Sequence, residues 1–196
     1  MAEQPVIVVA GPTASGKSGL AMDLAERIEG TIINADSMQV YRDLRILTAR
    51  PSQADEDRVP HLLYGNRDAT EAGSAADWAT AAHTAIQAVI DAGRRPLLVG
   101  GTGLYLKALM EGLAPIPEVP GEIRARAQAR RREIGDVAFH NELATRDPEI
   151  AARLHPGDSQ RVLRAWEVAE ATGRPLSDWQ NEPAIAPDKS FRVVII

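Results

Sequence analysis

The sequence has no cysteine among its 196 residues, which excludes disulfide bridges and thiolate metal sites. Its four histidines are not spaced as the ligands of a metal ion are. No apolar run approaches the ~20 residues that span a bilayer, and the first residues lack the basic and apolar regions of a signal peptide. With 44% hydrophobic and 25% charged residues, these absences predict a globular protein of the cytoplasm.

Positive charge is also in deficit, since the formal net charge is -5. Taken over the whole chain, this balance argues against a nucleic-acid partner. More than half of the arginines nevertheless lie between Arg124 and Arg174, and five of them crowd into residues 124–132. Such a run is typical of a solvated helix face. It also fits a local basic patch on an acidic body, so both interpretations stay open.

The most specific motif lies near the N-terminus and matches the phosphate-loop pattern G-x-x-x-x-G-K-[ST]. It follows an apolar run at residues 6–10 and precedes a helix-favouring segment at residues 19–28. In this arrangement backbone N–H groups and a helix N-terminus surround one oxyanion. The alternative is a Gly/Ser-rich turn that fits by chance. The motif predicts a bound diphosphate or triphosphate, with Mg²⁺ on the Ser18 hydroxyl. The predicted phosphate-binding residues are Gly11, Pro12, Thr13, Ala14, Ser15, Gly16, Lys17 and Ser18.

Two further apolar runs end in polar residues. The strand predicted at residues 31–35 is followed by Asp36, and the one at residues 95–99 by Gly100-Gly101-Thr102. Parallel strands open onto the ligand crevice at their carboxyl ends, so Asp36 is expected beside the phosphate. The alternatives are an Asx turn at Asp36 and a helix cap at Thr102. A kinase places a Mg²⁺-holding aspartate after such a strand, and none is present here.

The rest of the chain predicts a helical insertion. A proline-rich joint at residues 113–120 is followed by four helical patterns, at 121–134, 137–145, 148–154 and 159–172, without a strand. Residues 191–196 then predict a buried strand that reaches the end of the chain, and we expect further elements to cover it. The fold class is therefore α/β, a P-loop NTPase-like parallel sheet flanked by helices, with an α-helical insertion. The expected domains are the core 1–113, the insertion 114–186 and the last core strand 187–196.

Four blocks of sequence resemble one family when they are read in order. They are Gly11–Ser18, Ile32–Tyr41, Leu98–Tyr105 and Asp158–Ala165. Together they are similar to the tRNA dimethylallyltransferases, also called tRNA isopentenyltransferases or IPP transferases. The resemblance extends over essentially the whole chain.

This resemblance implies transfer of a dimethylallyl group from dimethylallyl diphosphate to N6 of the adenosine immediately 3′ of the tRNA anticodon. The phosphate loop then holds a diphosphate leaving group with Mg²⁺, Asp36 acts as the base, and Thr102 assists it. The insertion grips the anticodon stem-loop, and we expect a monomer. The tRNA contacts that the resemblance implies are Asp36, Ser37, Met38, Gln39, Thr102, Arg124, Gln160, Arg161, Val162, Leu163 and Arg164.

The chain departs from the family pattern at Leu47 and Arg50, where members commonly have glycine and lysine. Family members also continue beyond the equivalent of Ile196, with an arginine expected on the diphosphate. Three other functions share the motif. They are a small-molecule or nucleotide kinase, a prenyltransferase for free adenine nucleotides, and a nucleotide-gated binding module without chemistry.

Overall fold

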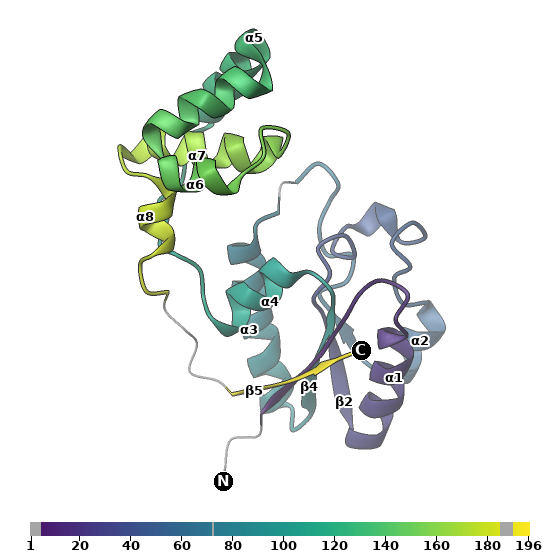
Figure 1. Ribbon diagram of the computed structural model, residues 1–196. Coiled ribbons are helices and arrows are strands. Elements are labelled where there is room, and N and C mark those ends of the chain that lie inside the picture. Colours follow the sequence, from purple (N-terminus) through teal and green to yellow (C-terminus); the bar gives the residue numbers. More distant parts are fainter. Residues whose placement is uncertain (1–4, 72, 185–189) are drawn as a thin grey trace. The chain divides into compact units, whose positions relative to one another are not determined.

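The computed structural model describes residues 5–71, 73–184 and 190–196. The chain divides into two compact units (Figure 1). The sheet unit comprises residues 1–113 and 186–196, and the helical unit comprises residues 114–185. The helical unit is therefore inserted in the chain between two parts of the sheet unit.

The sheet unit is built on five parallel strands in the order β3-β2-β4-β1-β5. The strands are β1 (Val6–Ala10), β2 (Gly30–Asn34), β3 (His61–Leu62), β4 (Arg95–Gly100) and β5 (Phe191–Ile195). The central three strands are buried, which explains their nearly continuous apolar sequences. The predicted α/β class with a parallel sheet is confirmed.

Helices cover both faces of this sheet. On one face α1 packs Ala21, Met22 and Ala25 against the strands, and on the other face lie α3 and α4. Helix α3 begins after Ser74, whose hydroxyl accepts a hydrogen bond from the Asp77 backbone N–H at 3.0 Å. The helical elements of this unit are α1 (Lys17–Ile28), the 3-10 turn η1 (Arg42–Leu44), α2 (Gln53–Arg58), α3 (Ala75–Asp91) and α4 (Gly103–Met110).

Strand β5 pairs with β1 and lies at the sheet edge. Val193, Val194 and Ile195 are exposed, so the further elements that we expect to cover this strand are not among the described residues. The apolar run predicts a strand correctly, but an edge position depends on which strands pair, and sequence periodicity does not contain that information.

The helical unit contains no strand within residues 114–184. Its helices are α5 (Gly121–Arg146), α6 (Pro148–Arg153), α7 (Ser159–Thr172) and α8 (Leu176–Gln180). Gly135 has φ 80°, so α5 is two helical segments joined at a kink, as the two separate sequence patterns suggest. A core around Phe139, Leu143 and Trp166 holds these helices together. No helix in the described parts of the chain is long and apolar enough to cross a membrane.

Asp147 ties three helices of this unit together. It is fully buried, and its carboxylate accepts hydrogen bonds from the Ile150 N–H at 3.0 Å and the Ser177 N–H at 2.9 Å. The Ser177 hydroxyl adds a third, at 2.8 Å. Asp147 therefore caps α6 and joins the end of α5 to the start of α8.

Replacing Asp147 with alanine is expected to lower the free energy of unfolding of the helical unit by about 2–4 kcal/mol, because buried donors lose their acceptor. Urea unfolding followed by tryptophan fluorescence measures this change. The matched control is Asp136→Ala, which removes an exposed ion pair with Arg131 and is expected to cost less than ~1 kcal/mol. Equal midpoints for the two variants would contradict the assignment.

Candidate active site

Three loops that the sequence analysis singled out lie at the same edge of the sheet. The phosphate loop follows β1, residues 35–39 follow β2, and residues 101–102 follow β4. Because β2, β4 and β1 are neighbours in a parallel sheet, their carboxyl ends meet. The site is therefore assembled by strand order.

The phosphate loop is open toward an anion. Gly16 has φ 87° and is the N-cap residue of α1, and no side chain caps the first turn. The N–H groups of that turn are thus available to a bound anion. The Ser15 hydroxyl is buried and has no hydrogen-bonding partner among the described residues, a costly state that a phosphate oxygen would relieve. The ammonium of Lys17 meanwhile donates to the Pro12 carbonyl at 2.6 Å.

The two glycines after β4 allow the loops to approach closely. A Cβ atom on Gly100 would collide with the backbone of Ala35, and one on Gly101 would lie 2.7 Å from the Gly11 carbonyl oxygen. No side chain fits at the end of this strand. Close packing of the loops therefore excludes the aspartate that a kinase would carry at Gly100 or Gly101.

Asp36 is held in place through Asn34, which is fully buried at the end of β2. The Asn34 side-chain oxygen accepts from the Asp36 N–H at 2.8 Å, and its amide nitrogen donates to the Leu63 carbonyl at 3.1 Å. One carboxylate oxygen of Asp36, Oδ1, accepts from the Met38 N–H at 2.8 Å. Asp36 thus forms the Asx turn that was the alternative interpretation. Oδ2 accepts no hydrogen bond from the described residues.

Thr102 is the N-cap residue of α4, but its hydroxyl does not cap the helix. It accepts a hydrogen bond from the Ser37 N–H at 2.9 Å and lies 3.3 Å from the Ser37 hydroxyl. Thr102 therefore joins the loop after β4 to the loop that carries Asp36. Capping does not explain this residue.

A cavity of about 370 Å³, here called the front cavity, lies at this edge of the sheet. It brings together the predicted phosphate-binding and catalytic groups Lys17, Ser18 and Asp36. Met38, Gln39 and Leu47 line it as well. Neither Thr102 nor Ser37 lines it, so the Thr102 hydroxyl contacts only the loop between the lining residues Asp36 and Met38.

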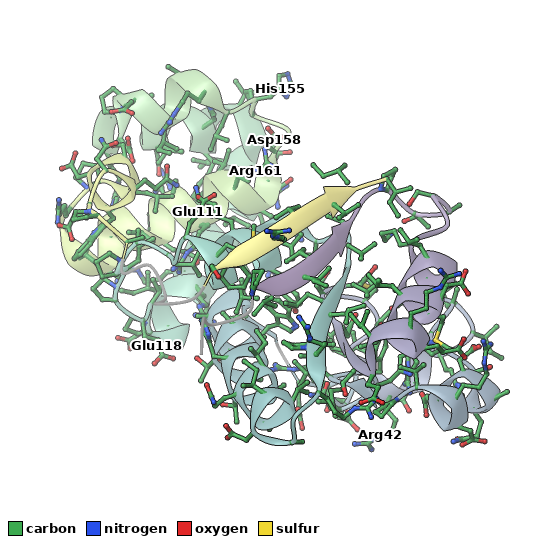
Figure 2. All side chains as sticks on the ribbon, turned by 90° about the horizontal axis from the view of Figure 1, so that it is seen from below. Arg42, Glu111, Glu118, His155, Asp158 and Arg161 are labelled. Carbon is green, nitrogen blue, oxygen red and sulfur yellow. The ribbon has the colours of Figure 1, made fainter. Side chains whose placement is uncertain are left out.

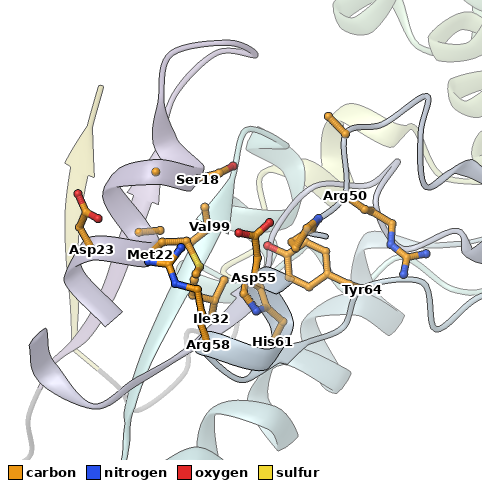
Figure 3. A pocket seen from close by; sticks show the side chains of 14 residues that line it. Ser18, Met22, Asp23, Ile32, Arg50, Asp55, Arg58, His61, Tyr64 and Val99 are labelled. Carbon is orange, nitrogen blue, oxygen red and sulfur yellow. The ribbon is translucent and has the colours of Figure 1, made fainter. Parts of the chain in front are cut away.

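A second cavity of about 280 Å³, the rear cavity, lies between α1 and α2 (Figure 3). Met22, Ile32 and Val99 contribute apolar lining, and Asp55, Arg58 and His61 contribute polar lining. The two cavities share Ser18, Ala49, Tyr64 and Val99. Burial, together with the nearby Asp36, raises the pKa of Tyr64 well above its ordinary value, so its phenol stays neutral.

Whether Mg²⁺ fits this site depends on the ligands that the diphosphate and water supply beside the protein. Among the described residues, no group of three His, Asp or Glu side chains can hold a metal ion. Mg²⁺, however, is commonly held by few protein ligands together with substrate phosphates and water. The Ser18 hydroxyl borders both cavities and meets that requirement when a diphosphate lies in the loop.

Most arginines in the first half of α5 form ion pairs within the helical unit. Arg130 binds Glu142 at 2.5 Å, and Arg131 binds Asp136 at 2.7 Å. Arg126 and Arg146 both contact Glu170, and the hydrogen bond from Arg146 is the main reason for the lowered pKa of Glu170. For these arginines the interpretation as a solvated, paired helix face holds.

Arg124, Arg161 and Arg164 differ from these residues, because none of them forms an ion pair with a described residue. Arg161 is exposed on α7 (Figure 2). Arg164 is half-buried, and burial lowers its pKa, an effect that Glu167 opposes and Arg124 reinforces. Unpaired guanidinium groups of this kind are suited to bind phosphate.

The other α7 residues that the resemblance named are placed differently. Val162 is 1% exposed and Leu163 is partly buried, and both belong to the core of the helical unit. The side chain of Val162 is therefore not accessible to a partner. The exposed Gln160 remains accessible beside Arg161.

Sequence reasoning missed Asn34 and Tyr64. A polar residue that ends an apolar strand was a signal for Asn34, since a buried amide must be hydrogen-bonded. Nothing near Tyr64 in the sequence indicates that it lines both cavities.

Comparison with known proteins identifies the family to which the chain is similar. The family model described as IPP transferase matches residues 39–196. The tRNA dimethylallyltransferase of Rhodospirillum centenum is 58% identical over 100% of this chain and 62% of its own length. That of Azorhizobium caulinodans is 55% identical over 96% of this chain and 62% of its own length. The chain thus spans less than two thirds of these relatives.

Two solved structures are also similar. A eukaryotic dimethylallyltransferase described as acting on tRNA has a TM-score of 0.78 and 31% identity, over 98% of this chain and 48% of its own. The tRNA isopentenylpyrophosphate transferase of Bacillus halodurans has a TM-score of 0.56 and 37% identity, over 88% and 57%. These findings confirm the resemblance that the four sequence blocks indicated.

Proposed function

Because the chain belongs to the IPP transferase family, we propose that it transfers a dimethylallyl group from dimethylallyl diphosphate to N6 of the adenosine 3′-adjacent to the tRNA anticodon. The observation that carries this proposal is the front cavity, which joins an uncapped phosphate loop to a carboxylate. We propose that it acts on tRNA in the cytoplasm, as a monomer.

The reaction needs a good leaving group first. The allylic C–O bond of dimethylallyl diphosphate breaks as the diphosphate takes the bonding electrons. The N–H groups at the start of α1 and the Lys17 ammonium stabilise the negative charge that develops. Lys17 must exchange its bond with the Pro12 carbonyl for one with the diphosphate. Mg²⁺, held by the Ser18 hydroxyl together with the diphosphate, would supply further positive charge to this group.

The acceptor amine then loses one proton. Its lone pair is delocalised into the purine, so it becomes strongly acidic only as the new C–N bond forms. A carboxylate with an ordinary pKa is sufficient as the base at that stage. Asp36 has one oxygen engaged by Met38 and a second oxygen that makes no hydrogen bond with the described residues. We assign the proton to that second oxygen, while Thr102 fixes the adjacent loop.

The helical unit is proposed to hold the anticodon stem-loop. Support comes from Arg124, Arg161 and Arg164, which lack ion pairs with described residues in a unit where most arginines are paired. The adenine must leave the loop stack to enter the front cavity, as in other enzymes that act on a base. The arginines bind the surrounding backbone and base edges.

The decisive experiment supplies the protein with labelled dimethylallyl diphosphate and an unmodified anticodon stem-loop RNA. A parallel reaction contains labelled ATP, and a third replaces RNA with AMP. We expect a prenylated adenosine in the RNA, detected by mass spectrometry, and no product in the other two. Phosphoryl transfer from ATP without prenylation would instead identify a kinase. Prenylation of AMP but not of RNA would identify a nucleotide prenyltransferase.

Replacing Arg161 with alanine is expected to weaken binding of the stem-loop about tenfold, or ~1.4 kcal/mol, because a phosphate contact is lost. The dependence of affinity on salt should decrease by about one ion. Affinity for dimethylallyl diphosphate should not change. The matched control is Arg131→Ala, since Arg131 is already paired with Asp136. Fluorescence anisotropy measures both variants, and equal affinities would remove Arg161 from the interface.

A further inference from the structure

Two large apolar side chains project from the sheet unit next to the front cavity. Ile46 is 95% exposed and Leu47 is 81% exposed, the highest values among the exposed large hydrophobic residues of the described chain. They lie side by side in the sequence at the tip of residues 42–50, here called the rim loop. Fully burying such a side chain is favourable by about 1.5–3 kcal/mol, so the pair has much to gain from a partner.

The rim loop is held in a fixed shape by its own hydrogen bonds. The Gln39 side-chain amide donates to the Thr48 carbonyl at 2.7 Å, and the Thr48 hydroxyl donates to the Leu44 carbonyl at 2.7 Å. The guanidinium of Arg50 packs against Gly65 and donates to the Arg42 carbonyl at 3.2 Å. These hydrogen bonds fix the backbone that carries the exposed pair. The exposure of Ile46 and Leu47 is therefore a property of an ordered loop.

The position of Ile46 and Leu47 indicates the chemistry of the partner that they contact. Leu47 lines the front cavity together with Asp36 and Lys17, and Ile46 precedes it directly. The rim loop also carries Arg42 and Arg45, both exposed, and the Arg42 side chain extends outward (Figure 2). The exposed Asp43 offsets part of this charge, and with Arg50 the loop keeps a net charge of +2. An apolar tip on a loop of net positive charge suits a partner that combines flat apolar faces with negative charge. A nucleic-acid loop has this combination, and an apolar protein surface does not.

We infer that Ile46 and Leu47 form a wedge that fills the gap left in the anticodon loop when the acceptor adenine enters the front cavity. This inference rests on the proposed function. Removing one base exposes the faces of its two neighbours, at a cost of a few kcal/mol. Aliphatic side chains inserted at such a step recover part of that cost. Arg42 and Arg45, which both precede the tip in the sequence, contact nearby phosphates of the anticodon loop.

The test uses a stem-loop RNA in which 2-aminopurine replaces the acceptor adenosine, because its fluorescence rises when the base leaves the stack. The variant is the double substitution Ile46→Ser with Leu47→Ser. Both side chains are exposed, so the fold is expected to be unaffected. The double substitution Ile46→Leu with Leu47→Met keeps an apolar tip and tests rescue. Val137→Ser, at a residue 65% exposed in the helical unit, is the control for removing an exposed apolar side chain.

For the serine variant we expect kcat/KM with unmodified stem-loop RNA to fall about tenfold, as expected for a stacking contact. The fluorescence rise at saturating protein should fall at least about twofold, while affinity for dimethylallyl diphosphate is unchanged. The apolar variant should restore both quantities, and Val137→Ser should leave both unchanged.

The possible failures differ from one another. An unchanged fluorescence rise and kcat/KM in the serine variant, with an active parent protein, overturns the wedge alone. A lower RNA affinity with an unchanged rise at saturation shows a plain contact surface and also overturns it. If the parent protein self-associates and the serine variant does not, while RNA binding and the fluorescence rise are unchanged, the tip contacts a second copy of the chain and the wedge is overturned. A parent protein without prenyl transfer overturns the proposed function and the wedge with it.

Discussion

Replacing Asp36 with alanine is expected to lower the rate of prenyl transfer to the stem-loop by about 10²–10⁴-fold, the range for loss of a general base. Affinity for dimethylallyl diphosphate should stay within about twofold, because Asp36 is proposed to face the acceptor and the phosphate loop follows a different strand. Single-turnover kinetics with saturating RNA measures the chemical step without product release.

Asp36 also accepts the Met38 N–H, so alanine removes a turn contact as well as a base. Asp36→Asn separates the two roles, since an amide oxygen can still accept that hydrogen bond while the charge is gone. We expect Asn to be nearly as slow as Ala. A rate close to that of the parent would show that Asp36 shapes the loop and takes no proton.

Replacing Lys17 with alanine is expected to lower prenyl transfer by about 10²–10³-fold, the effect of removing one group that stabilises a developing oxyanion. Unlike Asp36→Ala, this change should also weaken binding of inorganic diphosphate, which isothermal titration calorimetry measures. Lys17 lies at the first position of α1, where its ammonium already reaches the Pro12 carbonyl across the loop.

Lys17→Arg is the matched control because it keeps the positive charge. A guanidinium is planar and larger than an ammonium, so it is not expected to restore the rate in a loop of this size. Full activity in the arginine variant would show that the charge matters and its position does not. Normal diphosphate affinity in the alanine variant would place the diphosphate elsewhere.

The architecture of the sheet unit could be predicted because its signals are local. Apolar runs bounded by glycine and proline marked β1, β2 and β4, and the helical spacing of Trp78, Ala82, Ile86 and Val89 marked the buried face of α3. The parallel arrangement followed from the phosphate-loop motif between a strand and a helix. In the helical unit, α8 was not predicted, because five residues are too few to show a periodic pattern.

The contacts that shape the site could not be predicted, because they join distant parts of the chain. Thr102 binds Ser37 across 65 residues, and Asn34 binds Leu63 across 29. A residue type at one position does not reveal such a partner. The same limit applies to the arginines of α5 and α7, since only the structure separates those with an ion pair from those without one. The roles of Asp36, Thr102 and the unpaired arginines stay predictions.

The insertion of the helical unit between β4 and β5 affects how the chain is made. Strand β1 leaves the ribosome before the helical unit, but its parallel neighbour β5 follows only after the whole helical unit has been synthesised. One edge of the nascent sheet therefore stays open during that time, and an open edge invites pairing with other chains. Translation speed through the helical unit, and chaperones that shield β1, thus bear directly on the yield of the folded protein.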